Sequence, residues 1–182
     1  MMNSFANFLT ALSLLAPPLA AQEDAESAKR IQEVKDLRFG LFICWSFGTV
    51  SGKEWTQGVK NPSFFKVKGA ANTDQWAQAA KEAGMKYLLP LAKHHDGFCL
   101  WDTQTTLLKS TRSPYGRDLI RAVRKSAEKH GLKLALYFSL GDWGWHDGKN
   151  PDLLKKQLTE LLTHYGPIEY LWLDVAAGDG GL

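Results

Sequence analysis

A short polar run follows an apolar segment near the middle of the chain. In the stretch LAKHHDGFCLWDT, which covers residues 91–103, Lys93, His94, His95 and Asp96 come in succession. Four adjacent polar groups at the end of a buried strand cost free energy unless they are paired or bind something. The candidate ligands are a metal ion, a phosphate or a sugar, and the alternative is that nothing binds.

The other apolar runs also end in reactive side chains. Cys44 lies at the end of the first run, Asp142 and His146 lie beyond the third, and Asp174 closes the fourth in the stretch YLWLDV. A carboxylate that ends an apolar strand is costly to bury, and packing explains it poorly. The plainer alternative is that Asp174 caps the N-terminus of a following helix.

Sugar chemistry fits these residues better than metal, phosphate or serine-hydrolase chemistry. The chain has no HExxH or CxxC motif, no glycine-rich turn into a helix and no GxSxG motif. Adjacent histidines on extended backbone point to opposite sides, so both rarely bind one ion. The side chains that remain as candidate metal ligands are His94, His95, Asp96, His146 and Asp174. A glycosidase instead needs a carboxylate, donors for hydroxyl groups and aromatic walls.

Tryptophan is frequent, with seven residues in 182. Trp76 falls within a helix-forming segment, where core packing explains it. The other six lie at or after the ends of apolar runs: Trp45, Trp55, Trp101, Trp143, Trp145 and Trp172. In parallel α/β enzymes this edge of the sheet forms the site. For any single indole, filling the mouth of the fold is the simpler explanation, but we expect the six together to gather at a sugar-binding face.

The order of apolar and amphipathic segments predicts how these residues are brought together. Four short apolar runs rich in β-branched or aromatic residues are typical of buried strands: 38–46, 86–92, 132–139 and 169–174. Three amphipathic segments, each ended by glycine, predict helices: 72–84, 116–131 and 151–166. The order βαβαβαβ predicts an α/β fold of parallel strands with right-handed crossovers.

Composition indicates a globular protein without a nucleic-acid partner. The apolar fraction is 45% and the charged fraction 23%, which are ordinary values. The formal net charge is +3. The densest basic group has helical spacing and lies opposite an apolar stripe, which indicates a solvated helix face; it consists of Arg117, Arg121, Arg124 and Lys125.

The N-terminus has the pattern of a secretory signal peptide. An apolar stretch from Phe8 to Ala16 is followed by two prolines, small residues and an acidic run. The stretch is too short to span a bilayer, which takes about 20 residues; a retained membrane anchor is the alternative. We therefore predict a signal peptide over 1–21, a lead-in helix or linker over 22–37 and a catalytic unit over 38–182.

A cleaved signal predicts a secreted or periplasmic protein without a membrane span. An oxidising compartment would allow Cys44 and Cys99 to pair. Two cysteines do not make a disulfide scaffold, however, so unpaired thiols are the main expectation.

Six stretches, in this order, resemble the α-L-fucosidase family of retaining glycoside hydrolases (glycoside hydrolase family 29): FGLFICWS, GKEW, AKHHDGFCLWDT, GRDL, LALYFSLGDW and YGPIEYLWLD. The similarity extends from Arg38 to Asp174. It implies a (β/α)8-like TIM barrel and an exo-glycosidase that releases terminal α-linked L-fucose from an oligosaccharide or glycoconjugate, without metal or cofactor. Because a barrel of this type has eight strands, we interpret 38–182 as its N-terminal half, with the first four βα units.

The resemblance also implies roles for individual residues. Asp174 matches the family's nucleophile, and His94 and His95 match a histidine pair that holds fucose hydroxyls. The other residues predicted at the sugar pocket are Glu54, Trp55, Tyr137, Phe138, Trp172, Trp45 and Cys44. Lys93 would pair with a nearby carboxylate and Asp96 would orient an imidazole.

The chain departs from the family pattern at two places. Cys44, Trp45 and Ser46 stand where the family usually has His-Trp-Gly, and a thiol is a weaker donor than imidazole. Phe138 stands where a tyrosine is usual, which would remove a hydroxyl from the site. We expect these changes to affect specificity more than reaction type.

The general acid/base is the catalytic group that the resemblance does not place within the chain. In the family it comes from a segment after the nucleophile, so we expect it beyond Leu182. Candidates within the chain are Glu54, Asp142 and Asp147. Two other functions stay open, a non-catalytic sugar-binding protein and a metal-dependent hydrolase on a similar barrel. The oligomeric state is not predicted.

Overall fold

The computed structural model describes residues 19–142 and 150–174. Most of the predicted signal peptide, Trp143, Trp145, His146 and Asp147 therefore lie outside the described residues. The chain divides into two compact units, Met1–Asp36 and Leu37–Leu182.

The first unit contains helix α1, Leu19–Leu37, which runs on to the boundary between the units. Its exposed side chains form ion pairs one turn apart, between Arg30 and Glu26 at 3.2 Å and between Lys29 and Glu33 at 3.9 Å. Within residues 19–142 and 150–174 we find no helix with the length and apolarity needed to cross a membrane. The predicted cleavage of a signal peptide stays a prediction.

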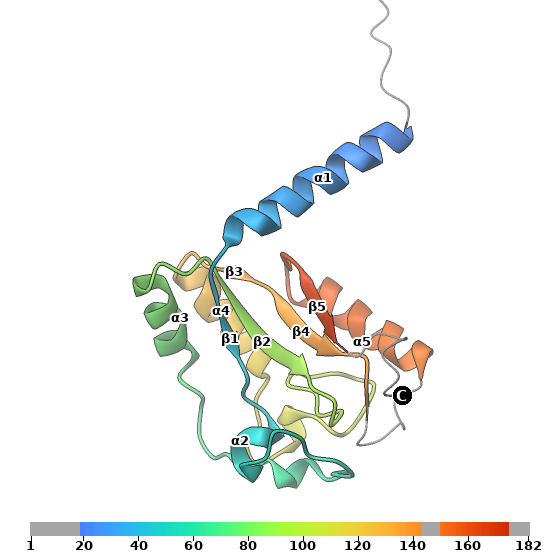
Figure 1. Ribbon diagram of the computed structural model, residues 1–182. Helices are drawn as coiled ribbons and strands as arrows, with labels where there is room; N and C mark the ends of the chain where they lie inside the picture. The colour runs from blue at the N-terminus through green and yellow to red at the C-terminus, as the bar shows by residue number, and fades with distance from the viewer. Residues whose placement is uncertain (1–18, 143–149, 175–182) are drawn as a thin grey trace, which may run out of the picture. The chain divides into compact units, whose positions relative to one another are not determined.

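The second unit is built on a parallel sheet in the order β1-β2-β4-β5, with β3 paired to β2 (Figure 1). The strands are β1 Gly40–Ile43, β2 Tyr87–Lys93, β3 Lys133–Leu134, β4 Leu136–Ser139 and β5 Leu171–Asp174. β3 and β4 are the two parts of the strand predicted over 132–139, interrupted at Ala135. The predicted parallel α/β architecture is confirmed, and it is consistent with part of a TIM barrel.

Three helices connect the strands, close to the predicted positions: α3 Thr73–Glu82, α4 Leu119–Lys129 and α5 Pro151–His164. Each begins after a residue whose side-chain oxygen accepts a backbone N–H of the first turn, at 2.8 to 3.1 Å; these residues are Asn72, Asp118 and Asn150. After α3 and α4 the chain passes through Gly84 and Gly131, which have φ of 78° and 64°. Such left-handed conformations favour glycine and end the helices.

Short elements extend the loops that follow the strands. They are α2 Phe47–Ser51 and the 3₁₀ helices η1 Pro62–Phe64 and η2 Ser110–Arg112. These short elements were not predicted from the sequence. Helix α2 follows β1 directly, so it lies beyond the carboxyl end of the sheet (Figure 1).

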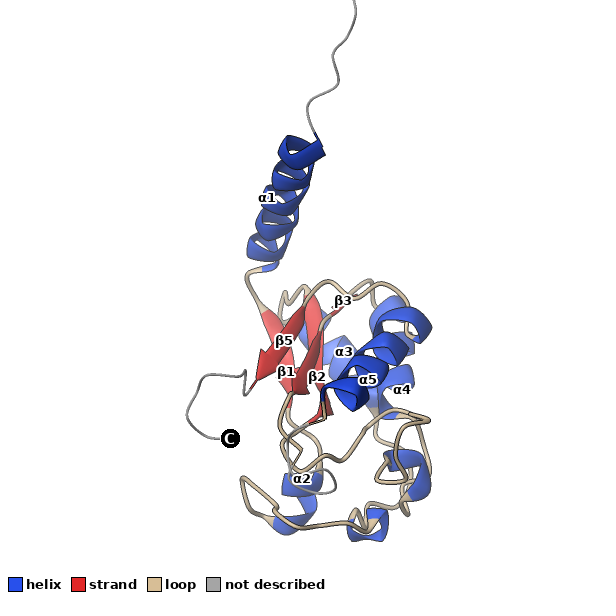
Figure 2. Ribbon diagram, turned by 90° about the vertical axis from the view of Figure 1, so that its right-hand side faces the viewer, coloured by secondary structure: helices blue, strands red, loops and turns tan. Residues whose placement is uncertain are grey.

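The helices α3, α4 and α5 cover one face of the sheet (Figure 2). The core on this side contains fully buried side chains from the strands and from α4, among them Leu88, Leu136, Phe138, Ile120 and Val123. On the other side, within the described residues, Phe42 and Trp172 are exposed by 42% and 47%. Among the described residues, this face therefore presents aromatic side chains beside the carboxyl ends of the strands.

Candidate active site

Asp174 is the last residue of β5, and polar groups from β4 and from the turn after β2 lie near its carboxylate. The Tyr137 hydroxyl donates a hydrogen bond to Asp174 Oδ2 at 2.5 Å. His95 Nε2 lies 3.7 Å from the same oxygen. The Asp174 side chain is 41% exposed. The carboxylate is thus oriented by the protein and still open to a ligand.

His94 and His95 lie together near this carboxylate, with ring centroids 4.2 Å apart. The His94 ring stacks on Tyr137 at 5.6 Å, and His95 Nδ1 lies 2.6 Å from Ser139 Oγ. We expected adjacent histidines to point to opposite sides. This was wrong, because β2 ends at Lys93 and the chain turns immediately afterwards.

Both imidazoles favour the neutral form. The pKa of His94 is lowered to about 4, first by burial and then by the neighbouring His95, against a smaller opposing effect of Asp174. Burial also lowers the pKa of His95, and Asp174 opposes this shift too. A neutral imidazole carries one donor and one acceptor nitrogen, which suits the recognition of hydroxyl groups.

A cavity of about 510 Å³ opens beside Asp174. Six of the residues predicted at the site line it: Cys44, Glu54, His94, Tyr137, Trp172 and Asp174. The lining also includes Phe42 and Lys53, which the sequence analysis missed. Phe42 precedes Cys44 by two residues, so the alternation of side chains along a strand was a signal that could have found it.

Aromatic rings form one wall of this cavity. Trp172 stacks on Phe42 with centroids 5.3 Å apart and an interplanar angle of 26°. Tyr137 meets Trp172 edge-on at 5.8 Å. Because the Trp172 indole is 47% exposed, part of this apolar surface is open to a ligand. Such a wall suits the C–H face of a sugar.

The expectation that six tryptophans gather at the site is wrong for Trp101, and Trp45 is not among the residues that line the cavity. Trp45 packs edge-on against Phe65 at 4.9 Å and belongs to an aromatic cluster. Trp101 is fully buried, and its Nε1 donates to Glu160 Oε2 at 2.9 Å. Trp55 is 54% exposed and is not among the residues that line the cavity.

The two departures from the family pattern have different consequences. Phe138 is fully buried, and Lys93 Nζ lies 4.6 Å from the centroid of its ring. A hydroxyl at this position would not face the cavity, so the expected effect of Phe138 on the sugar site was wrong. Cys44 does line the cavity, and partial burial raises the pKa of its thiol. Both cysteines, which lie in the described part of the chain, are unpaired.

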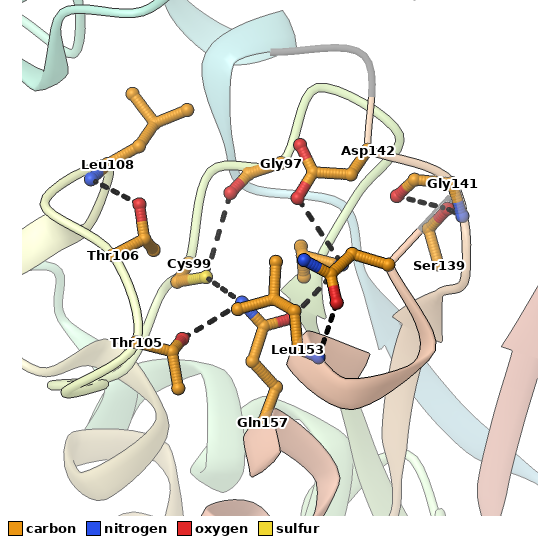
Figure 3. A network of polar contacts seen from close by, with 12 residues as sticks. Gly97, Cys99, Thr105, Thr106, Leu108, Ser139, Gly141, Asp142, Leu153 and Gln157 are labelled. Atoms are coloured by element: carbon orange, nitrogen blue, oxygen red, sulfur yellow. Dashed lines mark hydrogen bonds and ion pairs between the residues drawn. The ribbon is translucent and has the colours of Figure 1, made fainter. Parts of the chain in front are cut away.

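The last residue of β2, directly before His94, is a buried lysine. Lys93 is fully buried, and its Nζ donates to Gln157 Oε1 at 3.1 Å. Asp142 Oδ2 lies 3.9 Å from the same nitrogen, which confirms the expected pairing of Lys93 with a carboxylate. Gln157 also donates through Nε2 to Cys99 Sγ at 3.7 Å and Thr105 Oγ1 at 3.1 Å (Figure 3). We call Lys93 and Asp142 the buried ion pair.

Asp96 braces the same turn through backbone and hydroxyl groups. Its Oδ1 accepts the Phe98 backbone N–H at 3.0 Å, and its Oδ2 accepts the Thr56 hydroxyl at 3.3 Å. These contacts differ from the predicted one with an imidazole. The pKa of Asp96 is raised to about 6, mainly by burial and to a smaller extent by the nearby Asp142, while the two hydrogen bonds and Lys93 oppose the shift.

The family model for alpha-L-fucosidase matches residues 60–179. The chain belongs to the alpha-L-fucosidase family. "Alpha-L-fucosidase 1" of Arabidopsis thaliana is 38% identical over 149 residues, which cover 77% of this chain and 29% of the plant protein. The chain therefore spans less than a third of the length of this relative.

Two solved structures of the alpha-L-fucosidase family have the same fold. "Alpha-L-fucosidase isoenzyme 1" from Paenibacillus thiaminolyticus is 33% identical with a TM-score of 0.69, over 84% of this chain and 44% of that one. A trapped covalent intermediate of a Bacteroides thetaiotaomicron alpha-L-fucosidase, in complex with 2-fluoro-fucosyl fluoride, is 28% identical with a TM-score of 0.65. It covers 80% of this chain and 41% of that one.

The carboxyl groups predicted as in-chain candidates for the general acid/base differ in accessibility. Glu54 is exposed and lines the same cavity as Asp174. Asp142 is 4% exposed and belongs to the buried ion pair, so it is poorly placed to protonate a leaving group. Asp147 lies outside the described residues. Among residues 19–142 and 150–174, no cluster of three or more His, Cys, Asp and Glu side chains could hold a metal ion.

Proposed function

We propose that this chain provides part of the active site of a retaining exo-glycosidase that releases terminal α-L-fucose, with Asp174 as the nucleophile. The observation that carries the proposal is the position of the Asp174 carboxylate. It lies at the carboxyl end of a parallel strand, receives the Tyr137 hydroxyl at 2.5 Å, and lines a cavity with His94 and Trp172. In barrels of this type the carboxyl ends of the strands carry the catalytic residues.

The reaction follows the logic of two carboxyl groups. Asp174 attacks the anomeric carbon and forms a glycosyl-enzyme ester, while a second carboxyl group protonates the departing oxygen. Water then releases the sugar, with the second group acting as base. In retaining enzymes the two groups lie about 5–5.5 Å apart. The trapped covalent intermediate of the Bacteroides thetaiotaomicron relative supports this type of reaction.

The surrounding groups have defined tasks in this proposal. The Tyr137 hydroxyl holds Asp174 Oδ2 and keeps the carboxylate oriented before the attack. The neutral imidazoles of His94 and His95 hydrogen-bond to sugar hydroxyls, and Trp172 covers an apolar face of the ring. The acid/base carboxyl group comes from outside the described residues, and Glu54 is the in-chain alternative.

The substrate we propose is a fucosylated oligosaccharide or glycoconjugate, and the reaction needs no cofactor. We also propose a secreted or periplasmic location, supported by the signal-like pattern of 1–21. The names of the relatives support the substrate class, since "Alpha-L-fucosidase 1" of Arabidopsis thaliana and the isoenzyme of Paenibacillus thiaminolyticus are both fucosidases.

The test is hydrolysis of an aryl α-L-fucoside by this chain and by any longer product of its reading frame. A phenolate is a good leaving group and needs little protonation, so the assay measures the nucleophile and the pocket. Asp174→Asn should lower kcat by roughly 10³-fold or more, as for other groups at the centre of covalent catalysis. Asp102→Asn, at an exposed carboxylate outside the cavity, is the matched control.

The same proteins, assayed for both hydrolysis and fucose binding, distinguish the sugar-binding alternative. Fucose binding without hydrolysis, equal in the wild type and in Asp174→Asn, would favour a non-catalytic sugar-binding protein and contradict the proposal. Loss of activity on addition of a chelator would favour the metal-dependent alternative.

A further inference from the structure

We infer that Ser139 is a positioning residue that fixes the tautomer of His95, so that the Nε2 proton of His95 points toward Asp174. The inference deepens the proposed function and rests on it for the role of Asp174 as nucleophile. The hydrogen-bond arrangement itself is a property of the described residues and can be measured without turnover.

Ser139 lies beside Asp174 in the sheet. It is the last residue of β4, it is fully buried, and its register partner on β5 is Asp174. Three polar atoms surround its hydroxyl oxygen. The Gly141 backbone N–H donates to Oγ at 3.0 Å (Figure 3), His95 Nδ1 lies at 2.6 Å, and the Gly141 carbonyl oxygen lies at 3.4 Å.

Counting protons favours one arrangement of these contacts. A serine hydroxyl has one proton to donate and two lone pairs that accept. The Gly141 N–H occupies one lone pair, and the proton can go either to His95 Nδ1 or to the Gly141 carbonyl. The contact to Nδ1 is 0.8 Å shorter (3.4 − 2.6 Å), and the carbonyl contact exceeds the usual hydrogen-bond length. The hydroxyl therefore donates to His95 Nδ1, which must then carry a lone pair.

The protonation state of His95 leads to the same tautomer. Burial lowers the pKa of His95, although Asp174 opposes the shift, and His94 faces the same ring at 4.2 Å. A neutral imidazole whose Nδ1 accepts a hydrogen bond carries its single proton on Nε2. Nε2 lies 3.7 Å from Asp174 Oδ2. With the other tautomer, a lone pair would face the carboxylate.

In this arrangement two hydrogen-bond donors point toward the Asp174 carboxylate. Tyr137 donates to Oδ2 directly, and the Nε2–H of His95 lies within reach of the same oxygen or of a sugar hydroxyl placed between them. Donors aimed at a carboxylate favour its ionised form, which is the form that attacks. Ser139 touches neither the carboxylate nor the cavity in this arrangement, so it acts through His95.

The first test is the tautomer of His95 in the whole chain at pH 7. Long-range ¹H–¹⁵N NMR of the imidazoles distinguishes a protonated Nε2 from a protonated Nδ1, and a His95→Gln variant identifies the signal. We expect the Nε2–H form in the wild type. In Ser139→Ala we expect a mixture of tautomers, and in Ser139→Cys, whose thiol is a weaker donor, an intermediate result.

The second test is the direction in which the pKa of His95 moves in Ser139→Ala. A hydroxyl that donates to Nδ1 stabilises the neutral ring, so its removal should raise the pKa. If Nδ1 instead donated to the hydroxyl, removal would lower it. Ser126→Ala is the matched control, because Ser126 is a buried serine of α4 whose hydroxyl contacts Thr73 Oγ1 at 2.8 Å. It should leave the His95 signal unchanged.

A wild-type His95 in the Nδ1–H form would overturn the inference, and this result needs no variant that has to fold. A folded Ser139→Ala variant with an unchanged tautomer, or with a lowered pKa of His95, would overturn it as well. Failure of the proposed function is recognised separately, by hydrolysis that survives Asp174→Asn.

Discussion

Replacing Lys93 by methionine should destabilise the protein strongly, because it removes the buried ammonium group that faces the Asp142 carboxylate. The Lys93 side chain is 0% exposed and that of Asp142 is 5% exposed. Methionine has a similar length and no charge, so the change removes the cation while most of the packing is kept. The lost interactions are the ion pair at 3.9 Å, the hydrogen bond to Gln157 at 3.1 Å and the contact of Nζ with the Phe138 ring at 4.6 Å.

Removal of one partner of a buried ion pair costs about 3–5 kcal/mol, mainly because the remaining charge is uncompensated. A hydrogen bond from a charged donor contributes about 1.5–3 kcal/mol and overlaps with that figure rather than adding to it. We therefore expect Lys93→Met to lower the free energy of unfolding by about 3–5 kcal/mol. Lys93→Met combined with Asp142→Asn should recover part of this loss, because the second change removes the buried negative charge that Lys93 faces.

The assay is urea unfolding of the whole chain, followed by circular dichroism. Lys125→Met is the matched control, since Lys125 is exposed on α4, and it should change the free energy of unfolding by no more than about 0.5 kcal/mol. If Lys93→Met lost less than about 1 kcal/mol, or the double variant were no more stable than the single one, the reasoning about the buried ion pair would be refuted.

Three further predictions concern the same region. Relative to Asp96→Asn, the wild type should lose free energy of unfolding as the pH rises from 3.8 to about 6, because the pKa of Asp96 is higher in the folded than in the unfolded state. Urea unfolding across this pH range measures the difference. Equal pH profiles of the two proteins would contradict the prediction. Gly97→Ala should lower the free energy of unfolding more than Gly58→Ala. Both glycines have a positive φ, +77° and +70°, but only at Gly97 would a Cβ clash with the carboxylate of the buried ion pair. We expect about 1–2 kcal/mol at Gly58 and about 1–3 kcal/mol more at Gly97, measured in the same way. A thiol reagent should modify exposed Cys44 in the native protein and leave buried Cys99 unmodified until urea is added; equal rates would contradict the described burial.

The main strands and helices could be predicted because their sequences carry strong local signals. Buried parallel strands read as continuous apolar runs, and capping residues such as Asn72 and Asp118 precede amphipathic helices. The short elements α2, η1 and η2 contain too few residues to show a period, so nothing in the sequence distinguished them from loops.

The site was predicted less completely, since sequence position does not tell where a side chain points. Trp45 and Trp101 follow strands as expected, yet Trp101 is fully buried and Trp45 is partly buried against the core. The His94 and His95 rings lie together because β2 ends at Lys93, just before them. Strand ends are the least certain feature of a sequence-based assignment. The position of Phe138, in contrast, could have been predicted. Side chains alternate along β4, so Phe138 points to the other face of the sheet from Tyr137.

The most direct test of Asp174 as a retaining nucleophile is covalent labelling with 2-fluoro-fucosyl fluoride, followed by intact mass measurement and peptide mapping. We predict that the protein gains one fluorofucosyl group on the Asp174 carboxylate, and that Asp174→Asn gains none. A label on another carboxylate, such as Glu54, would contradict the assignment. An unlabelled protein that still hydrolyses an aryl α-L-fucoside would contradict the covalent mechanism itself.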